Sequence, residues 1–164
     1  MSKQFHCASV FTVFAMLCIV LFAPAAAFAQ AQARWFSAWS VSHNARQAMP
    51  DLSNSTVRMF VRPTVSGASV RVKLENTLGQ TPVSFSSAFI GVADSGASLV
   101  AGSNKRLTFA SRTNLTIAPG EGAWSDPVVM EGKAFQRLAV SLDVSSASDI
   151  STPTPGLGTN YTAQ

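Results

Sequence analysis

The sequence predicts an all-β protein, an antiparallel β-sandwich or jelly-roll-like domain that follows a cleaved N-terminal signal peptide. Short segments alternate apolar and polar residues, as in residues 70–75, where Arg71, Lys73 and Glu75 face away from the apolar side chains. This period of two is typical of half-buried strands. Gly, Pro, Asn and Ser separate the segments, and after residue 29 no window keeps helical apolar spacing beyond about two turns. Several short strands at such intervals favour a sandwich.

Residues 1–29 have the composition of a bacterial-type export signal. A short start with Lys3 precedes the almost wholly apolar residues 10–22, and Ala27 and Ala29 place small residues at the positions that a signal peptidase reads. We expect cleavage after Ala29 and export to the periplasm or the extracellular space. The alternative is an uncleaved anchor, because residues 5–23 approach the roughly 20 apolar residues that span a bilayer. Membrane contact is expected only through such an uncleaved signal.

Cleavage would leave a mature chain with one histidine, His43, and no cysteine, since Cys7 and Cys18 lie within the signal. Burial alone must then stabilise the domain, which we place at residues 30–144. The 12 basic residues of the whole chain are scattered among 8 acidic ones, so nucleic-acid binding is not expected. Ser, Thr and Asn supply most of the polar surface, which is typical of an exported β-protein.

The expected strands follow one another along the chain. Residues 56–62 alternate and end at Pro63, which cannot donate to a sheet ladder. Ser66 and Gly67 indicate a turn into residues 68–76, and the two segments together suggest a hairpin. Residues 83–93 form a longer run that can cross a sandwich and bend. Four further strands are expected at residues 106–110, 114–117, 128–130 and 137–144.

Two other segments differ from this pattern. Residues 45–52 can form one short helical turn. Residues 145–164 shift to Ser, Thr, Pro and Gly, with Pro153 and Pro155 on either side of Thr154, and the apolar alternation stops. This composition predicts a tail or a linker.

Several segments, read in order, resemble the region that precedes the catalytic domain in exported SGNH/GDSL-type hydrolases, an esterase and lipase family. The resemblance starts at Trp35 and Trp39, similar to a paired-tryptophan start, and includes Asn76 and Gly79, although Glu75 replaces a serine of the family. It covers nearly all of residues 35–161. Further matching segments are residues 56–58, 61–62, 70–74, 107–109, 117, 119–120, 125–128, 138–142 and 159–161.

The resemblance implies a β-sandwich ahead of an α/β esterase domain, which would be its partner. The Gly-Asp-Ser block and the Asp-x-x-His pair of that esterase domain do not occur in this sequence. Residues 94–96 read Asp-Ser-Gly, but Ala93 stands in place of the glycine and no helix-forming run follows. The resemblance therefore implies a non-catalytic N-terminal accessory domain that ends before the nucleophile block and is inactive alone.

We expect no catalytic residue, metal or cofactor in this chain. His43 is the only possible base of a Ser-His-Asp arrangement in the mature sequence, and its Asn- and Ser-containing surroundings suit an exposed loop. The carboxylates are widely separated in sequence and zinc ligands are lacking, although the fold itself can still assemble a calcium site.

The tryptophans Trp35, Trp39 and Trp124 are candidate binding residues, because their flat rings can contact sugars. The alternative, which the resemblance favours for Trp35 and Trp39, is that they pack against the sandwich.

Arg58, Arg62 and Arg71, together with Lys73, would form a basic stripe if their two strands pair. Such a stripe suits an acidic polysaccharide or a partner domain, and the alternative is a solvated sheet face. The second function hypothesis is accordingly a stand-alone polysaccharide-binding or protein-interaction module of the cell envelope.

Overall fold

The computed structural model describes residues 34–41, 51–147 and 160–163, the last four through their backbone alone. The predicted signal peptide, His43, most of the predicted helical turn and most of the predicted tail lie outside the described residues. The chain divides into two units, Met1–Phe36 and Ser37–Gln164, and every strand belongs to the second unit.

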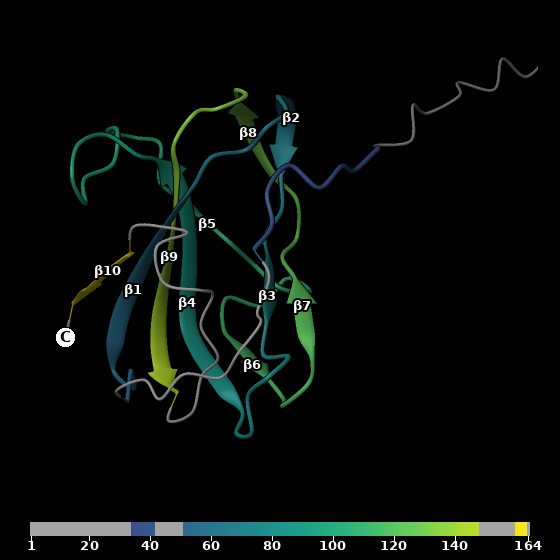
Figure 1. Cartoon of the computed structure of the whole chain (residues 1–164), viewed down its shortest axis with the longest axis vertical. Helices are drawn as coiled ribbons and strands as arrows, with labels where there is room; N and C mark the ends of the chain where they lie inside the picture. The colour runs from purple at the N-terminus through teal and green to yellow at the C-terminus, as the bar shows by residue number, and fades with distance from the viewer. Residues whose placement is uncertain (1–33, 42–50, 148–159, 164) are drawn as a thin grey trace, which may run out of the picture. The chain divides into compact units, whose positions relative to one another are not determined.

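Six strands of that unit form one antiparallel sheet, hereafter the six-stranded sheet (Figure 1). The strand order is β10–β1–β9–β4–β5, and β6 also pairs with β4. β9 is central, because it hydrogen-bonds to β1 on one side and to β4 on the other. The strands are β1 (Ser55–Val61), β4 (Val83–Val92), β5 (Lys105–Arg106), β6 (Leu115–Ile117), β9 (Leu138–Ser146) and β10 (Asn160–Ala163).

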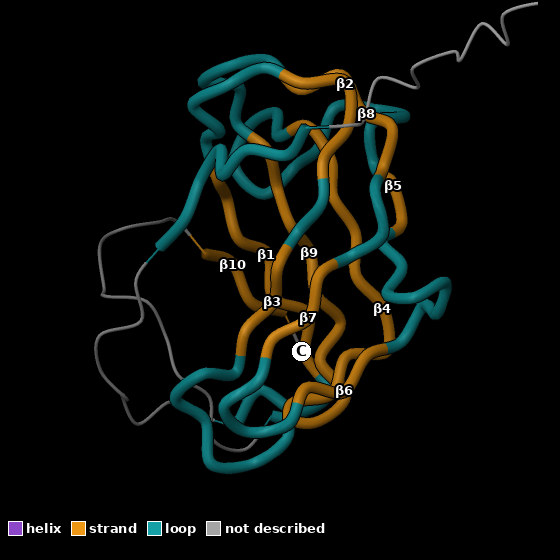
Figure 2. The backbone as a smooth tube through the Cα atoms, turned by 90° about the vertical axis from the view of Figure 1, so that its right-hand side faces the viewer, coloured by secondary structure: helices purple, strands orange, loops and turns teal. Residues whose placement is uncertain are grey.

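The second layer is a two-stranded ribbon that lies in front of the six-stranded sheet in Figure 2. β2 (Gly67–Val70) pairs with β8 (Val128–Gly132), and β3 (Lys73–Glu75) pairs with β7 (Gly122–Trp124). Ser125 joins the two short pairs: its N–H donates to the Val72 carbonyl at 2.8 Å, and its hydroxyl accepts the Val72 N–H at 2.9 Å. We call the joined pairs the ribbon.

The predicted all-β fold with antiparallel sheets is confirmed, whereas the predicted hairpin between residues 56–62 and 68–76 is wrong. β1 pairs with β9 and β10, while β2 and β3 pair with β8 and β7 in the other layer. The chain changes layers after Pro63. Proximity in sequence and a turn signal do not fix a strand's partner, because backbone N–H and C=O groups can pair with those of any strand.

The other predicted strands lie near their expected places, with a few differences. Residues 68–76 break into β2 and β3, and of residues 106–110 only the first lies in a strand. β7 and β10 were not predicted, the first because it is three residues long and the second because its composition is that of a tail. β9 continues to Ser146, past the expected domain end at residue 144. The described part of the chain holds no helix long and apolar enough to cross a bilayer.

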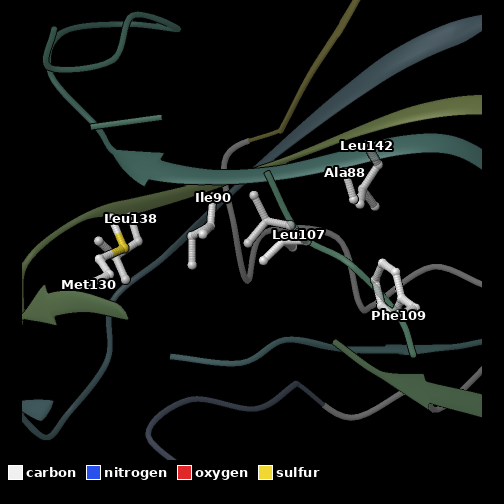
Figure 3. Packing of buried hydrophobic residues seen from close by; sticks show 8 residues of the cluster. Ala88, Ile90, Leu107, Phe109, Met130, Leu138 and Leu142 are labelled. Carbon is white, nitrogen blue, oxygen red and sulfur yellow. The ribbon is translucent and has the colours of Figure 1, made fainter. Parts of the chain in front are cut away.

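The hydrophobic core fills the space between the six-stranded sheet and the ribbon (Figure 3). Alternate residues of β4 and β9 point into it and meet side chains of the ribbon. Ile90, Leu107 and Leu138 are almost fully removed from water, and such burial stabilises the fold by about 1.5–3 kcal/mol for each side chain. The buried cluster comprises Ala88, Ile90, Leu107, Phe109, Met130, Leu138, Val140 and Leu142.

The segment after β5 crosses between the two layers and is bonded to both. The Leu107 N–H donates to the Ala88 carbonyl of β4 at 2.8 Å, and the Thr108 carbonyl accepts the Asp126 N–H at 2.7 Å. The segment then turns through Ala110 and Ser111, whose φ angles are 49° and 64°. This left-handed conformation is unfavourable for residues with a Cβ, so neighbouring contacts must hold the turn.

Asn76 joins two loops at one end of the sandwich. Its side-chain Nδ2 donates to the carbonyls of Thr81 at 2.9 Å and Ile117 at 3.2 Å, and its own carbonyl accepts the Gly120 N–H at 2.9 Å. The residue is 2% exposed. A Cβ at position 79 would lie 1.8 Å from Asn76 Oδ1, so only glycine allows the chain to pass this close.

Candidate binding surface on the ribbon

Trp124 lies on the outer face of the ribbon and is 52% exposed. It is the last residue of β7, directly opposite Lys73 of β3. Its neighbours Ala123 and Ser125 point inward, the first into the core and the second into the bonded junction with Val72. Because successive residues of a strand face opposite sides, the indole is directed away from the core.

Two cationic side chains lie over the Trp124 ring. The Arg71 guanidinium carbon is 4.8 Å from the ring centroid, and Lys73 Nζ is 5.8 Å from it. Both distances allow a cation–π attraction. Lys73 also forms a salt bridge with Glu75, so two cations and one carboxylate leave one net positive charge around the indole. Of the predicted binding residues, the structure therefore brings Arg71 and Trp124 together.

Asp126 holds the chain segment that follows Trp124. Its Oδ2 accepts the Thr108 hydroxyl at 2.6 Å and the Ser111 N–H at 2.8 Å. The Thr108 hydroxyl and then the Ser111 N–H lower the pKa of Asp126 below its ordinary value, because both bonds favour the charged carboxylate. The carboxylate thus fixes the left-handed turn at Ala110 and Ser111 against the ribbon.

This arrangement predicts a pH-dependent effect of Asp126→Asn. Since the folded pKa lies below the unfolded one, the carboxylate stabilises the fold above an unfolded pKa of about 3.9, and the contribution disappears as pH falls through the lower folded value. We expect the variant to melt below the wild type at pH 7 and the difference to shrink below about pH 4. Thermal melts across this range measure it.

Asp51→Asn is the matched control, because the Ser53 side chain and N–H lower the pKa of Asp51 in a separate loop. The two effects should add, since the sites share no partner. A melting difference for Asp126→Asn that stays constant from pH 7 to pH 3 would show that the Asp126 charge is not responsible.

The predicted basic stripe is wrong, because its members lie on different sheets. Arg58 belongs to β1, where its Nε donates to the Ser141 hydroxyl at 2.8 Å and its Nη1 donates to the Ala97 carbonyl. Arg62 is exposed just beyond the end of β1. Arg71 lies in the ribbon instead. The stripe depended on the hairpin, which does not form.

The two tryptophans near the start of the described residues remain partly exposed. Trp35 is 38% exposed and belongs to the first unit, where Arg34 lies 5.5 Å from the ring of Phe36. Trp39 is 39% exposed, and the preceding Ala38 accepts the Thr64 N–H at 2.7 Å. Trp39 is not among the buried residues of the core.

The Asp-Ser-Gly sequence and the possible metal ligands also have definite places in the structure. Residues 94–96 form an exposed turn in which the Ser98 N–H donates to the Ser95 carbonyl, and Gly96 has a φ of 54°. Within residues 34–41, 51–147 and 160–163, no three or more His, Cys, Asp or Glu side chains come together as metal ligands.

Sequence reasoning missed Val129, which is 78% exposed on the same outer face as Trp124. Val129 lies in β8 opposite Ser69, while its neighbours Val128 and Met130 contact the core. The run Val128–Met130 is apolar throughout, so alternation gives no sign of which residue faces water. The pairing register was needed to find it.

The sequence was compared with known proteins. No family model matches it, and no curated protein matches it significantly.

Proposed function

We propose that this chain is the non-catalytic N-terminal accessory domain of an exported SGNH/GDSL-type esterase or lipase. The supporting observation is the place of the residues that carry the resemblance. Several of them lie at points where the layers and loops of the sandwich are bonded together, and at such points a substitution disturbs the fold most. A shared fold would keep these residues in order along the chain.

Two junctions in the sandwich contain such residues. Asn76, Gly79 and Gly120 form the loop junction at one end, where the buried amide excludes any side chain at position 79. Ser125 completes the pairing of the ribbon, and Asp126 bonds the ribbon to the crossing segment. Each group matches a segment of the resemblance, which supports a common sandwich rather than chance similarity of strand composition.

The partner in this proposal is an α/β hydrolase domain, and the role of the sandwich is to support and position it. The decisive test is the coding DNA downstream of the Gln164 codon, read in all frames. We expect a Gly-Asp-Ser block and, further on, an Asp-x-x-His pair. An intergenic region with neither block would overturn the accessory role and favour a stand-alone binding module.

A second test concerns activity. The purified protein should neither hydrolyse short-chain nitrophenyl esters above background nor react with a fluorophosphonate probe, because the proposal gives the nucleophile to the partner. Hydrolysis that disappears when one of this chain's own serines is replaced by alanine would contradict the proposal.

Export of the chain is also part of the proposal. Mass spectrometry of the secreted chain should find Gln30 as the first residue. A retained signal would instead support the anchor.

A further inference from the structure

The outer face of the ribbon combines an indole, cations and an exposed aliphatic side chain. Val129 faces outward at one end, opposite Ser69, and Trp124 faces outward at the other, opposite Lys73. Ser69 and Lys73 are four residue steps apart, or about 13 Å at the rise of a β-strand. Arg71 lies between them on the same strand and reaches the Trp124 ring. The outward side chains are thus spread along the ribbon and form an elongated exposed strip.

The chemistry of this strip suits a ligand with apolar faces and negative charge. The half-exposed indole offers a flat apolar surface at small entropic cost, and Val129 offers a second apolar contact further along the strip. At the Trp124 end, Arg71 and Lys73 outnumber Glu75 by one charge and lie beside the ring. Glu131, exposed two residues after Val129, places a carboxylate at the other end, so the positive charge is confined to the surroundings of Trp124. A uronic-acid sugar matches both features, since its ring has an apolar C–H face and carries a carboxylate.

We propose that the outer face of the ribbon binds a linear acidic polysaccharide. One uronate ring stacks on Trp124 with its carboxylate toward Arg71 and Lys73, and a ring further along the polymer contacts Val129. An acidic peptide fits less well, because peptides add to sheets through the backbone of an exposed strand edge, whereas these side chains project from the face. The site does not depend on the hydrolase assignment.

Titration calorimetry with the purified protein tests the proposal. The probes are oligogalacturonate, a neutral glucan of similar length and poly-glutamate. We expect oligogalacturonate to bind more tightly than the other two, with an affinity that falls as salt rises. Trp124→Ala should weaken binding by about tenfold, and Trp124→Phe should weaken it less. Arg71→Gln should also weaken binding, whereas Glu75→Gln should strengthen it by removing the opposing charge.

Arg62→Gln is the matched control, because it removes the same charge from an exposed site that follows β1. It should leave the affinity unchanged, and melting curves should show that every variant is folded. The proposal is overturned if the folded wild type binds no acidic glycan, or if Trp124→Ala binds as the wild type does. It is also overturned if poly-glutamate binds as tightly as oligogalacturonate. None of these outcomes bears on the downstream hydrolase blocks, so the two proposals fail separately.

Discussion

Gly79→Ala is expected to destabilise the domain by about 3 kcal/mol, although it adds a single methyl group. The new Cβ would lie 1.8 Å from Asn76 Oδ1 and 2.7 Å from its Cγ, well inside contact distance. The Asn76 amide must then move, which breaks its hydrogen bonds to the carbonyls of Thr81 and Ile117. Urea unfolding measures the loss as a lower midpoint at an unchanged slope.

A double-mutant cycle with Asn76→Ala identifies the cause. Asn76→Ala alone should cost about 1–3 kcal/mol, because it removes the donor to the buried Ile117 carbonyl. In the double variant the alanine at position 79 no longer meets the amide, so the two costs should be far from additive. Gly96→Ala is the control: its φ is 54° and a Cβ there meets nothing within 4 Å, so only about 1 kcal/mol of backbone strain is expected. A cost for Gly79→Ala no larger than this would refute the steric explanation.

Leu107→Ala is expected to cost about 3–5 kcal/mol, the upper part of the range for buried leucines. Leu107 is 0% exposed and packs in the core, and its own backbone is bonded to β4. The crossing segment is held from both layers, so it cannot easily collapse into the space left by the side chain, and an unfilled cavity raises the cost.

The same unfolding measurement on Val129→Ala provides the comparison. Val129 is 78% exposed, so its truncation should change stability by no more than about 0.5 kcal/mol. If Leu107→Ala proved as mild as Val129→Ala, the crossing segment would have to be more adaptable than its bonds to Ala88 and Asp126 indicate.

Strands β1 and β9 are predictable from the sequence because each is long enough to show alternation. β4 is predictable as a long run of residues typical of strands. Their partners are not predictable in the same way. β1 is followed at once by a turn, yet its partners come from the far end of the domain. The ladder bonds that pair them use backbone groups, which are alike in every strand. β7, with Gly122, Ala123 and Trp124, offers one inward side chain, which is too little to show a period.

The candidate surface was partly predictable. Aromatic and basic residues in a sequence of low charge stand out, and Trp124 and Arg71 were identified on that ground. Their proximity depends on the pairing of β3 with β7, while the same pairing rules separate Arg71 from Arg58. Residue types can therefore indicate candidate residues of a site, but the register of strand pairing determines which of them share a face.

The central position of β9 determines when the sheet can form during synthesis. Thr56 of β1 bonds to Asp143 of β9 across 87 positions, and among the described strands β1 pairs only with β9 and β10. In a nascent chain that has not yet reached β9, β1 has no partner, and the edge of β4 that pairs with β9 is also unpaired. Such distant pairings form slowly, and unpaired edges invite association with other chains until they close. Premature release before residue 138 should therefore yield aggregating chains rather than a smaller folded domain.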